Sequence, residues 1–172
     1  MTSFDTCLAA LKQPGPPERL FETVDRALAA TVGHKLFTLL YVAPNGRRVK
    51  RIYTNMPDAY PVGGYKEVTA TPWHQRVIGE RCAWVGYSAK DIEWAFFDHE
   101  LIVSLGCESA INVPVVFAGQ VLGTMNLLAP AGKWPNSSFQ TDDPGAPNDS
   151  ASFAGTFPVY CRTNVPHLSS LR

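Results

Sequence analysis

The chain has 172 residues, a length typical of one domain, and its 45% hydrophobic and 17% charged residues exclude global disorder. Its 15 Lys and Arg residues balance 15 Asp and Glu residues, so the formal net charge is zero. A neutral chain gives no electrostatic reason to expect nucleic acid or an anionic membrane as a partner.

The sequence carries no targeting signal and no spaced set of metal ligands. No apolar run approaches the roughly 20 residues that cross a bilayer, and the N-terminus has no basic leader, so we expect a cytoplasmic protein. The histidines show no metal-ligand spacing, and we expect neither a metal nor another cofactor. Because no two cysteines form a CxxC pair, we expect four free thiols, at Cys7, Cys82, Cys107 and Cys161.

The N-terminal part predicts two helices and then a β-hairpin. A short helix starts at Thr2 or Ser3, and the proline-rich segment 14–17 separates it from a second helix over residues 18–32. Apolar runs at 35–43 and 49–53 flank an Asn-Gly turn, which is typical of a hairpin. The basic cluster beside this turn is interpreted as a solvated hairpin rather than a phosphate site; it comprises Arg47, Arg48, Lys50 and Arg51.

The middle of the chain predicts a long loop over 56–71 with a short edge strand, then a short helix opened by Thr71-Pro72 and a strand over 82–86. A variant capping box, with Ser at 88 and Asp at 91, begins a helix that we expect to run to residue 105. This helix has two apolar stripes. The second stripe needs a neighbouring helix, a ligand or a second subunit, and it suggests a homodimer.

The last regular elements form a hairpin of strands 110–117 and 120–128 around Ala118-Gly119. Pro114 indicates an edge position or a bulge. With this turn, Asn112 and Asn126 are expected to face opposite sides of the sheet. Beyond 128 the periodicity ends, and residues 133–172 are expected to contribute little to stability.

The segment 104–128 closely resembles the end of a GAF domain. It contains Val113-Pro114-Val115, a glycine-containing turn, and a return strand reading Val-Leu-Gly-Thr-Met-Asn-Leu over 121–127. The resemblance covers about residues 18–130, between an N-terminal helix and Pro-rich break over 1–17 and an irregular tail over 131–172. It implies an α+β fold, GAF/PAS-like, with a central antiparallel sheet of about six strands and helices packed on one face. Loops and a short helix on the other face of such domains often enclose a ligand.

The resemblance also implies a stand-alone sensor, since GAF domains serve signal transduction by binding small molecules. We expect a non-catalytic domain that binds a small metabolite. The pattern typical of cyclic-nucleotide binding is absent apart from its end, and neither Cys82 nor Cys107 has the neighbouring histidine that bilin attachment favours. One alternative is an enzyme similar to free methionine-R-sulfoxide reductases, since residues 107–110 resemble a Cys-Asp-Ser-Ala stretch of that family. Another is a ligand-free protein-interaction module.

The candidate ligand site is mainly aromatic. We expect a cavity between the loop 61–71, the short helix after it, the strand 82–86 and the start of the following helix. Aromatic walls with few charges predict a flat, neutral or weakly polar ligand. The residues expected to bind it are Tyr53, Tyr65, Trp73, His74, Trp84, Trp94, Phe96, Ser109 and Asn112.

Overall fold

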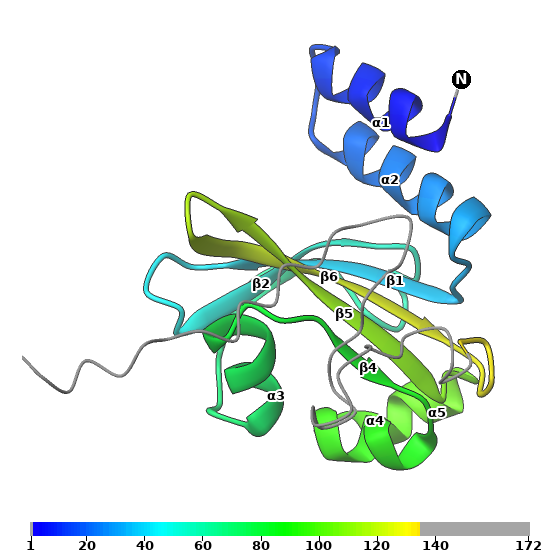
Figure 1. Ribbon diagram of the computed structural model, residues 1–172, viewed down its shortest axis with the longest axis vertical. Helices are drawn as coiled ribbons and strands as arrows, with labels where there is room; N and C mark the ends of the chain where they lie inside the picture. Colours follow the sequence, from blue (N-terminus) through cyan, green and yellow to red (C-terminus); the bar gives the residue numbers. More distant parts are fainter. Residues whose placement is uncertain (1, 135–172) are drawn as a thin grey trace, which may run out of the picture.

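A six-stranded antiparallel sheet forms the centre of the computed structural model, which describes residues 2–134 (Figure 1). The strand order is β3-β2-β1-β6-β5-β4, and all neighbours are antiparallel. The strands are β1 (Leu36–Val42), β2 (Arg48–Thr54), β3 (Gly63–Glu67), β4 (Trp84–Gly86), β5 (Ser109–Phe117) and β6 (Gln120–Ala129). The predicted α+β fold class, both hairpins and the short edge strand are therefore confirmed.

Helices lie on both sides of the sheet (Figure 1). On one side, which we call the α2 face, are α1 (Ser3–Lys12) and α2 (Glu18–Thr31). On the other, the α3 face, are α3 (Pro72–His74), the π-helical turn η1 (Gln75–Gly79), α4 (Ala89–Ala95) and α5 (His99–Ser104). Two buried cores result because each face of the sheet carries apolar side chains, with Phe37 central to one core and Ile92 to the other.

The helix expected over 88–105 is two helices, so that prediction is wrong. The capping box at Ser88 and Asp91 is present, but the backbone turns extended at Phe96, with φ −127° and ψ 128°. The turn lets the Phe96 ring pack against Trp73 and Trp84. Packing against the sheet thus outweighs the helical periodicity of the segment.

The buried core continues beyond the last strand. Trp134 is 5% exposed and belongs to the core on the α2 face, together with Leu28 and Phe37. The expectation that residues from 133 onwards add little to stability is therefore wrong for Trp134, because a buried indole removes a large apolar area from water. The rest of the expected tail, residues 135–172, lies outside the described residues.

Candidate functional site

Four of the predicted ligand-binding aromatics form one cluster on the α3 face. The ring centroids of Trp73 and Phe96 are 6.0 Å apart, and those of Trp84 and Phe96 are 5.9 Å apart. Trp94 stacks on Trp84 at 5.9 Å and is 54% exposed. The side chains that we expected to line a cavity therefore pack against one another, and the cluster reaches the surface at Trp94.

Beneath this cluster a chain of hydrogen bonds crosses three strands. The indole Nε1 of Trp73 donates to Oδ1 of Asn112 at 2.9 Å, and Nδ2 of Asn112 donates to Oδ1 of Asn126 at 2.8 Å. Nδ2 of Asn126 in turn lies 3.2 Å from the hydroxyl oxygen of Thr38. Both asparagines are buried, so their amides need these partners. Trp73 is thereby tied to the sheet by a polar contact as well as by packing.

The two asparagines lie on the same face, and the expectation that they face opposite sides is wrong. A bulge in the β5–β6 ladder is the cause. Val116 pairs with Val121, but Val115 pairs with Gly123, so Leu122 is an extra residue and the register beyond it shifts by one. Gly123 suits this position because a Cβ there would lie 2.2 Å from the Leu40 carbonyl oxygen.

A second bulge turns a cation towards the same face. Leu39 pairs with Tyr53, but Leu40 pairs with Arg51, which places Arg51 on the α3 face. Its guanidinium carbon lies 4.6 Å from the centroid of the Tyr60 ring. The Tyr60 hydroxyl donates to Asp98 at 2.9 Å, and burial, followed by the Asp98 charge, raises the pKa of Tyr60. The basic cluster was expected to lie in solvent on the hairpin. Arg47 and Arg48 are exposed as expected, but Arg51 is half-buried, so the expectation is wrong for Arg51.

Several buried polar atoms have no hydrogen-bond partner among the described residues. Among those on this side of the sheet are the Oγ1 of Thr124, the Nε of Arg51 and the Nε2 of His74. Thr124 is 1% exposed, and it and Arg51 pair with Leu40 from opposite sides, so Thr124, Leu40 and Arg51 share one row of the sheet, whereas His74 lies on α3. Buried polar groups are nearly always paired, so unpaired donors on one side of the sheet indicate a side where another molecule can bind.

The remaining predicted site residues are not part of this arrangement. Tyr65 is 52% exposed on β3, where its ring lies under Arg48. Ser109 lies on the α2 face, and its hydroxyl donates to the carbonyl oxygens of Ala129 and Pro130 at 3.1 and 2.9 Å. The structure therefore brings six of the nine residues to the α3 side and separates Tyr53, Tyr65 and Ser109 from them.

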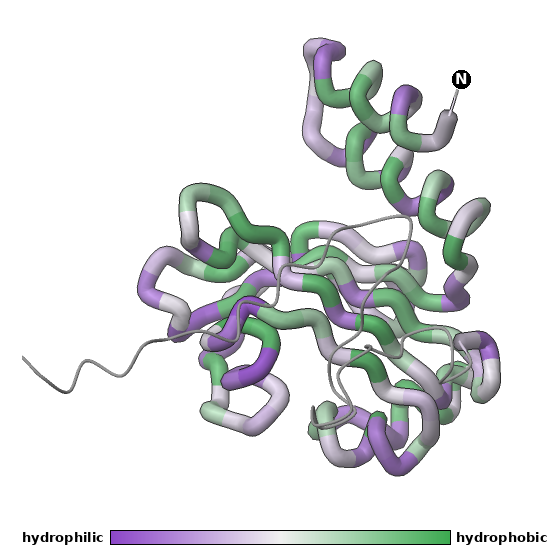
Figure 2. Tube along the Cα trace, in the orientation of Figure 1, coloured by the Kyte–Doolittle hydropathy of each residue, from purple (hydrophilic) through white to green (hydrophobic). Residues whose placement is uncertain are grey.

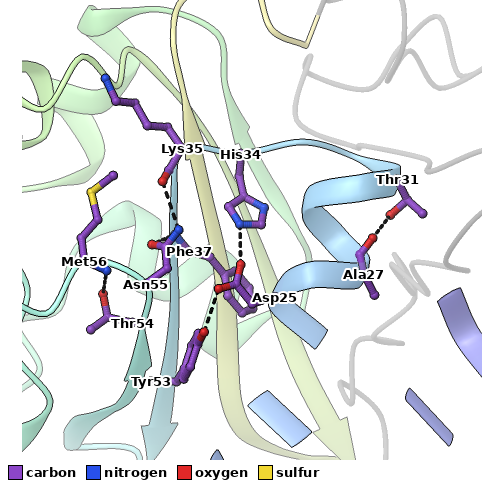
Figure 3. Close-up of polar contacts among 10 residues, drawn as sticks. All are labelled: Asp25, Ala27, Thr31, His34, Lys35, Phe37, Tyr53, Thr54, Asn55 and Met56. Atoms are coloured by element: carbon purple, nitrogen blue, oxygen red, sulfur yellow. Dashed lines mark hydrogen bonds and ion pairs between the residues drawn. The ribbon is translucent and has the colours of Figure 1, made fainter. Parts of the chain in front are cut away.

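Tyr53 belongs to a separate polar network on the α2 face (Figure 3). Its hydroxyl donates to Oδ2 of Asp25 at 2.7 Å, while Oδ1 of Asp25 lies 2.7 Å from Nε2 of His34. The network ties α2 to β2 and to the start of β1 through side chains that are largely buried. Burial, followed by the hydrogen bond to Asp25, raises the pKa of Tyr53 and keeps it neutral. We assign this network a structural role.

Residues that the sequence interpretation did not include are Arg51, Tyr60, Asp98 and Thr124. Arg51 was noticed only as one member of a basic run, and nothing in the local pattern marks the bulge that turns it inwards. A hollow of about 530 Å³ lies elsewhere, between α1 and α2 beside Pro14 and Arg26.

No two of the three cysteines in the described part of the chain are bonded to each other. Cys7 and Cys107 are free, whereas Cys82 is disulfide-bonded, so the prediction of four free thiols is wrong at Cys82. Cys161 lies outside the described residues. Burial raises the pKa of the Cys107 thiol, which lowers its thiolate fraction and with it the reactivity that a nucleophile needs.

Within residues 2–134, no three acidic, histidine or cysteine side chains gather as a metal site. Over the same range, no helix has the length and apolar character needed to cross a bilayer.

Comparison with known proteins identifies the fold. No protein-family model and no curated protein matches the sequence. Among solved structures, the GAF domain of a phosphoenolpyruvate-protein phosphotransferase from Coxiella burnetii is 12% identical with a TM-score of 0.59, covering 75% of this chain and 76% of that one. The GAF domain of a two-component sensor histidine kinase from Bacillus halodurans is 13% identical, with a TM-score of 0.54 and coverage of 68% and 78%.

A third similar structure is fRMsr of Staphylococcus aureus, in complex with substrate. It is 8% identical, has a TM-score of 0.55, and covers 78% of this chain and 82% of that one. Sequence identities this low establish the fold alone. The chain therefore has the GAF-domain fold.

Proposed function

We propose that the chain is a non-catalytic GAF-type sensory domain that binds a small cytoplasmic metabolite on the α3 face of its sheet. The observation that carries this proposal is the group of unpaired buried atoms on Thr124, Arg51 and His74. All three can donate a hydrogen bond, so the ligand that suits them bears acceptor oxygens or nitrogens. The aromatic cluster beside them supplies the flat apolar wall that a small-molecule site requires.

Binding at this place requires the aromatic cluster to rearrange. Trp73 lies on a three-residue helix followed by a π-helical turn, and its indole is held to the sheet by the bond to Asn112. A ligand acceptor would compete with the Asn112 side-chain oxygen for the indole N–H of Trp73. Ligand binding and the position of α3 are therefore coupled. A moving α3 gives the domain a way to transmit the signal.

The packed cluster is also what a ligand-free interaction module would show. The unpaired atoms distinguish the two functions, because a core that never binds a ligand gains nothing from burying them. The reductase alternative receives less support, since Cys107 is buried with a raised thiol pKa.

A thermal-shift screen of small metabolites against the full chain tests the proposal. We expect at least one compound to raise the melting temperature and to change tryptophan fluorescence. Arg51→Gln should then weaken that compound's binding by about tenfold or more, because a hydrogen bond to a charged donor is lost. Arg48→Gln is the matched control, since Arg48 lies on the same strand but is exposed. Equal effects of the two variants, or no active compound, would contradict the proposal.

A further inference from the structure

The tip of the β5–β6 hairpin is an exposed apolar projection. Val115, Val116, Phe117 and Leu122 are 39%, 45%, 71% and 44% exposed. No charged residue occurs in the whole segment 109–132, so the tip can enter an apolar environment without burying a charge. The projection and its apolar character can be followed in Figures 1 and 2.

The shape of this tip suits a lipid surface better than a folded protein partner. Val115 and Val116 are successive strand residues, so they point to opposite faces of the hairpin. The strands pair up to Phe117 and Gln120, which satisfies their backbone groups, and the turn itself contains only Ala118 and Gly119. A folded protein partner would need a pocket that encloses both faces of the hairpin tip. A lipid interface can cover both faces without a preformed pocket.

Unneutralised cations lie at the same end of the sheet. Tyr41 near the end of β1 pairs with Gly123 of β6, so the turn after β1 is next to the hairpin tip. Arg47 and Arg48 in and after that turn are exposed, and Lys50 follows on β2. None of these three cations forms an ion pair with any residue in the described range, although Glu67 lies opposite Arg48 in the β2–β3 register.

We propose that this end of the sheet docks on an anionic membrane surface, with the β5–β6 tip in the headgroup layer and the cations of the β1–β2 turn against the lipid charges. Apolar insertion and attraction to anionic lipid reinforce each other in interfacial binding. The zero net charge of the chain does not oppose this docking. Salt screens electrostatic interactions beyond about 10 Å, so only the charges near the membrane surface contribute. This site shares no residue with the proposed ligand site and does not depend on it.

Vesicle flotation with the full chain tests this inference. We expect binding to phosphatidylcholine vesicles that contain phosphatidylserine, weaker binding to phosphatidylcholine alone, and loss of binding between about 0.1 M and about 1 M salt. Phe117→Ser should lower the partition coefficient about tenfold, because most of its apolar ring is involved. Arg47→Glu with Arg48→Glu should lower it by more than the roughly fivefold expected for each neutralised cation.

Matched control variants distinguish binding at this site from non-specific binding to vesicles. Phe4→Ser removes a phenylalanine that is 66% exposed on α1, and Lys12→Glu with Lys90→Glu reverses two exposed charges elsewhere. Both controls should bind vesicles as the unmodified chain does. The inference is overturned if the unmodified chain does not float with anionic vesicles, or if the controls lose as much binding as the tip variants. It is also overturned if Phe117→Ser converts a lipid-free dimer to a monomer, since the tip would then be a self-association surface.

Discussion

Replacing Thr124 with valine tests directly whether the hydroxyl beneath α3 is unpaired. Thr124 is 1% exposed and its Oγ1 has no partner among the described residues. Burying a hydroxyl without a partner costs about 1–3 kcal/mol, and valine has nearly the same shape without that group. We therefore expect Thr124→Val to raise the free energy of unfolding by about 1–3 kcal/mol. For a chain of this size, each 1 kcal/mol corresponds to about 2–4 °C in melting temperature.

Thr38→Val is the matched control for this substitution. Thr38 is also buried in a strand on the same face, but its hydroxyl oxygen lies 3.2 Å from Nδ2 of Asn126. Removing it should lower the free energy of unfolding by about 1–3 kcal/mol, because the Asn126 amide loses a partner. Urea unfolding of the two variants and the unmodified chain measures both changes. If Thr124→Val destabilises as Thr38→Val does, the Thr124 hydroxyl has a partner in solution and the reasoning for a ligand site fails.

Four further predictions concern other parts of the structure. Because the pKa of Tyr60 is raised, the unfolded chain releases this proton above pH of about 10 while the folded chain retains it, so the free energy of unfolding should fall as pH rises past that value. Urea unfolding across this range should show a weaker fall in Tyr60→Phe, and identical slopes would refute the assignment. Trp134→Ala should lower the free energy of unfolding by about 3–5 kcal/mol, and an unchanged urea midpoint would show that Trp134 is not part of the core. No methionine sulfoxide turnover is expected, since Cys107 is buried; turnover that disappears in Cys107→Ser would establish the reductase instead. Light scattering should show a homodimer that Phe97→Ser with Leu101→Ser converts to a monomer, because both side chains are exposed on the α4–α5 segment; a monomeric unmodified chain would contradict this.

The local signals in the sequence were sufficient for the strands, the hairpins and the starts of the helices, but not for the break between α4 and α5. Turn residues, such as Ala118-Gly119 with positive φ at both positions, marked the hairpins. Capping residues, such as Ser88, marked where helices begin. These features depend on a few neighbouring residues, so they can be recognised without the rest of the fold. The four aromatic residues that gather on the α3 face were predicted differently, from the resemblance to GAF domains, whose pocket is surrounded by the elements that carry them.

The make-up of the candidate site depended on register, which only the tertiary structure decided. The bulge at Leu122 brings Asn112 and Asn126 together, and the bulge beside Leu40 turns Arg51 to the same face. A shift of one residue moves a side chain to the other face of a sheet, and whether it occurs depends on packing across several strands. Apolar patterning and turn chemistry thus predicted the two hairpins and the first helices, and the resemblance of segment 104–128 to a GAF domain implied the six-stranded α+β fold. Which polar side chains meet beneath α3 was decided by contacts between strands far apart in the sequence, because only those contacts set the register.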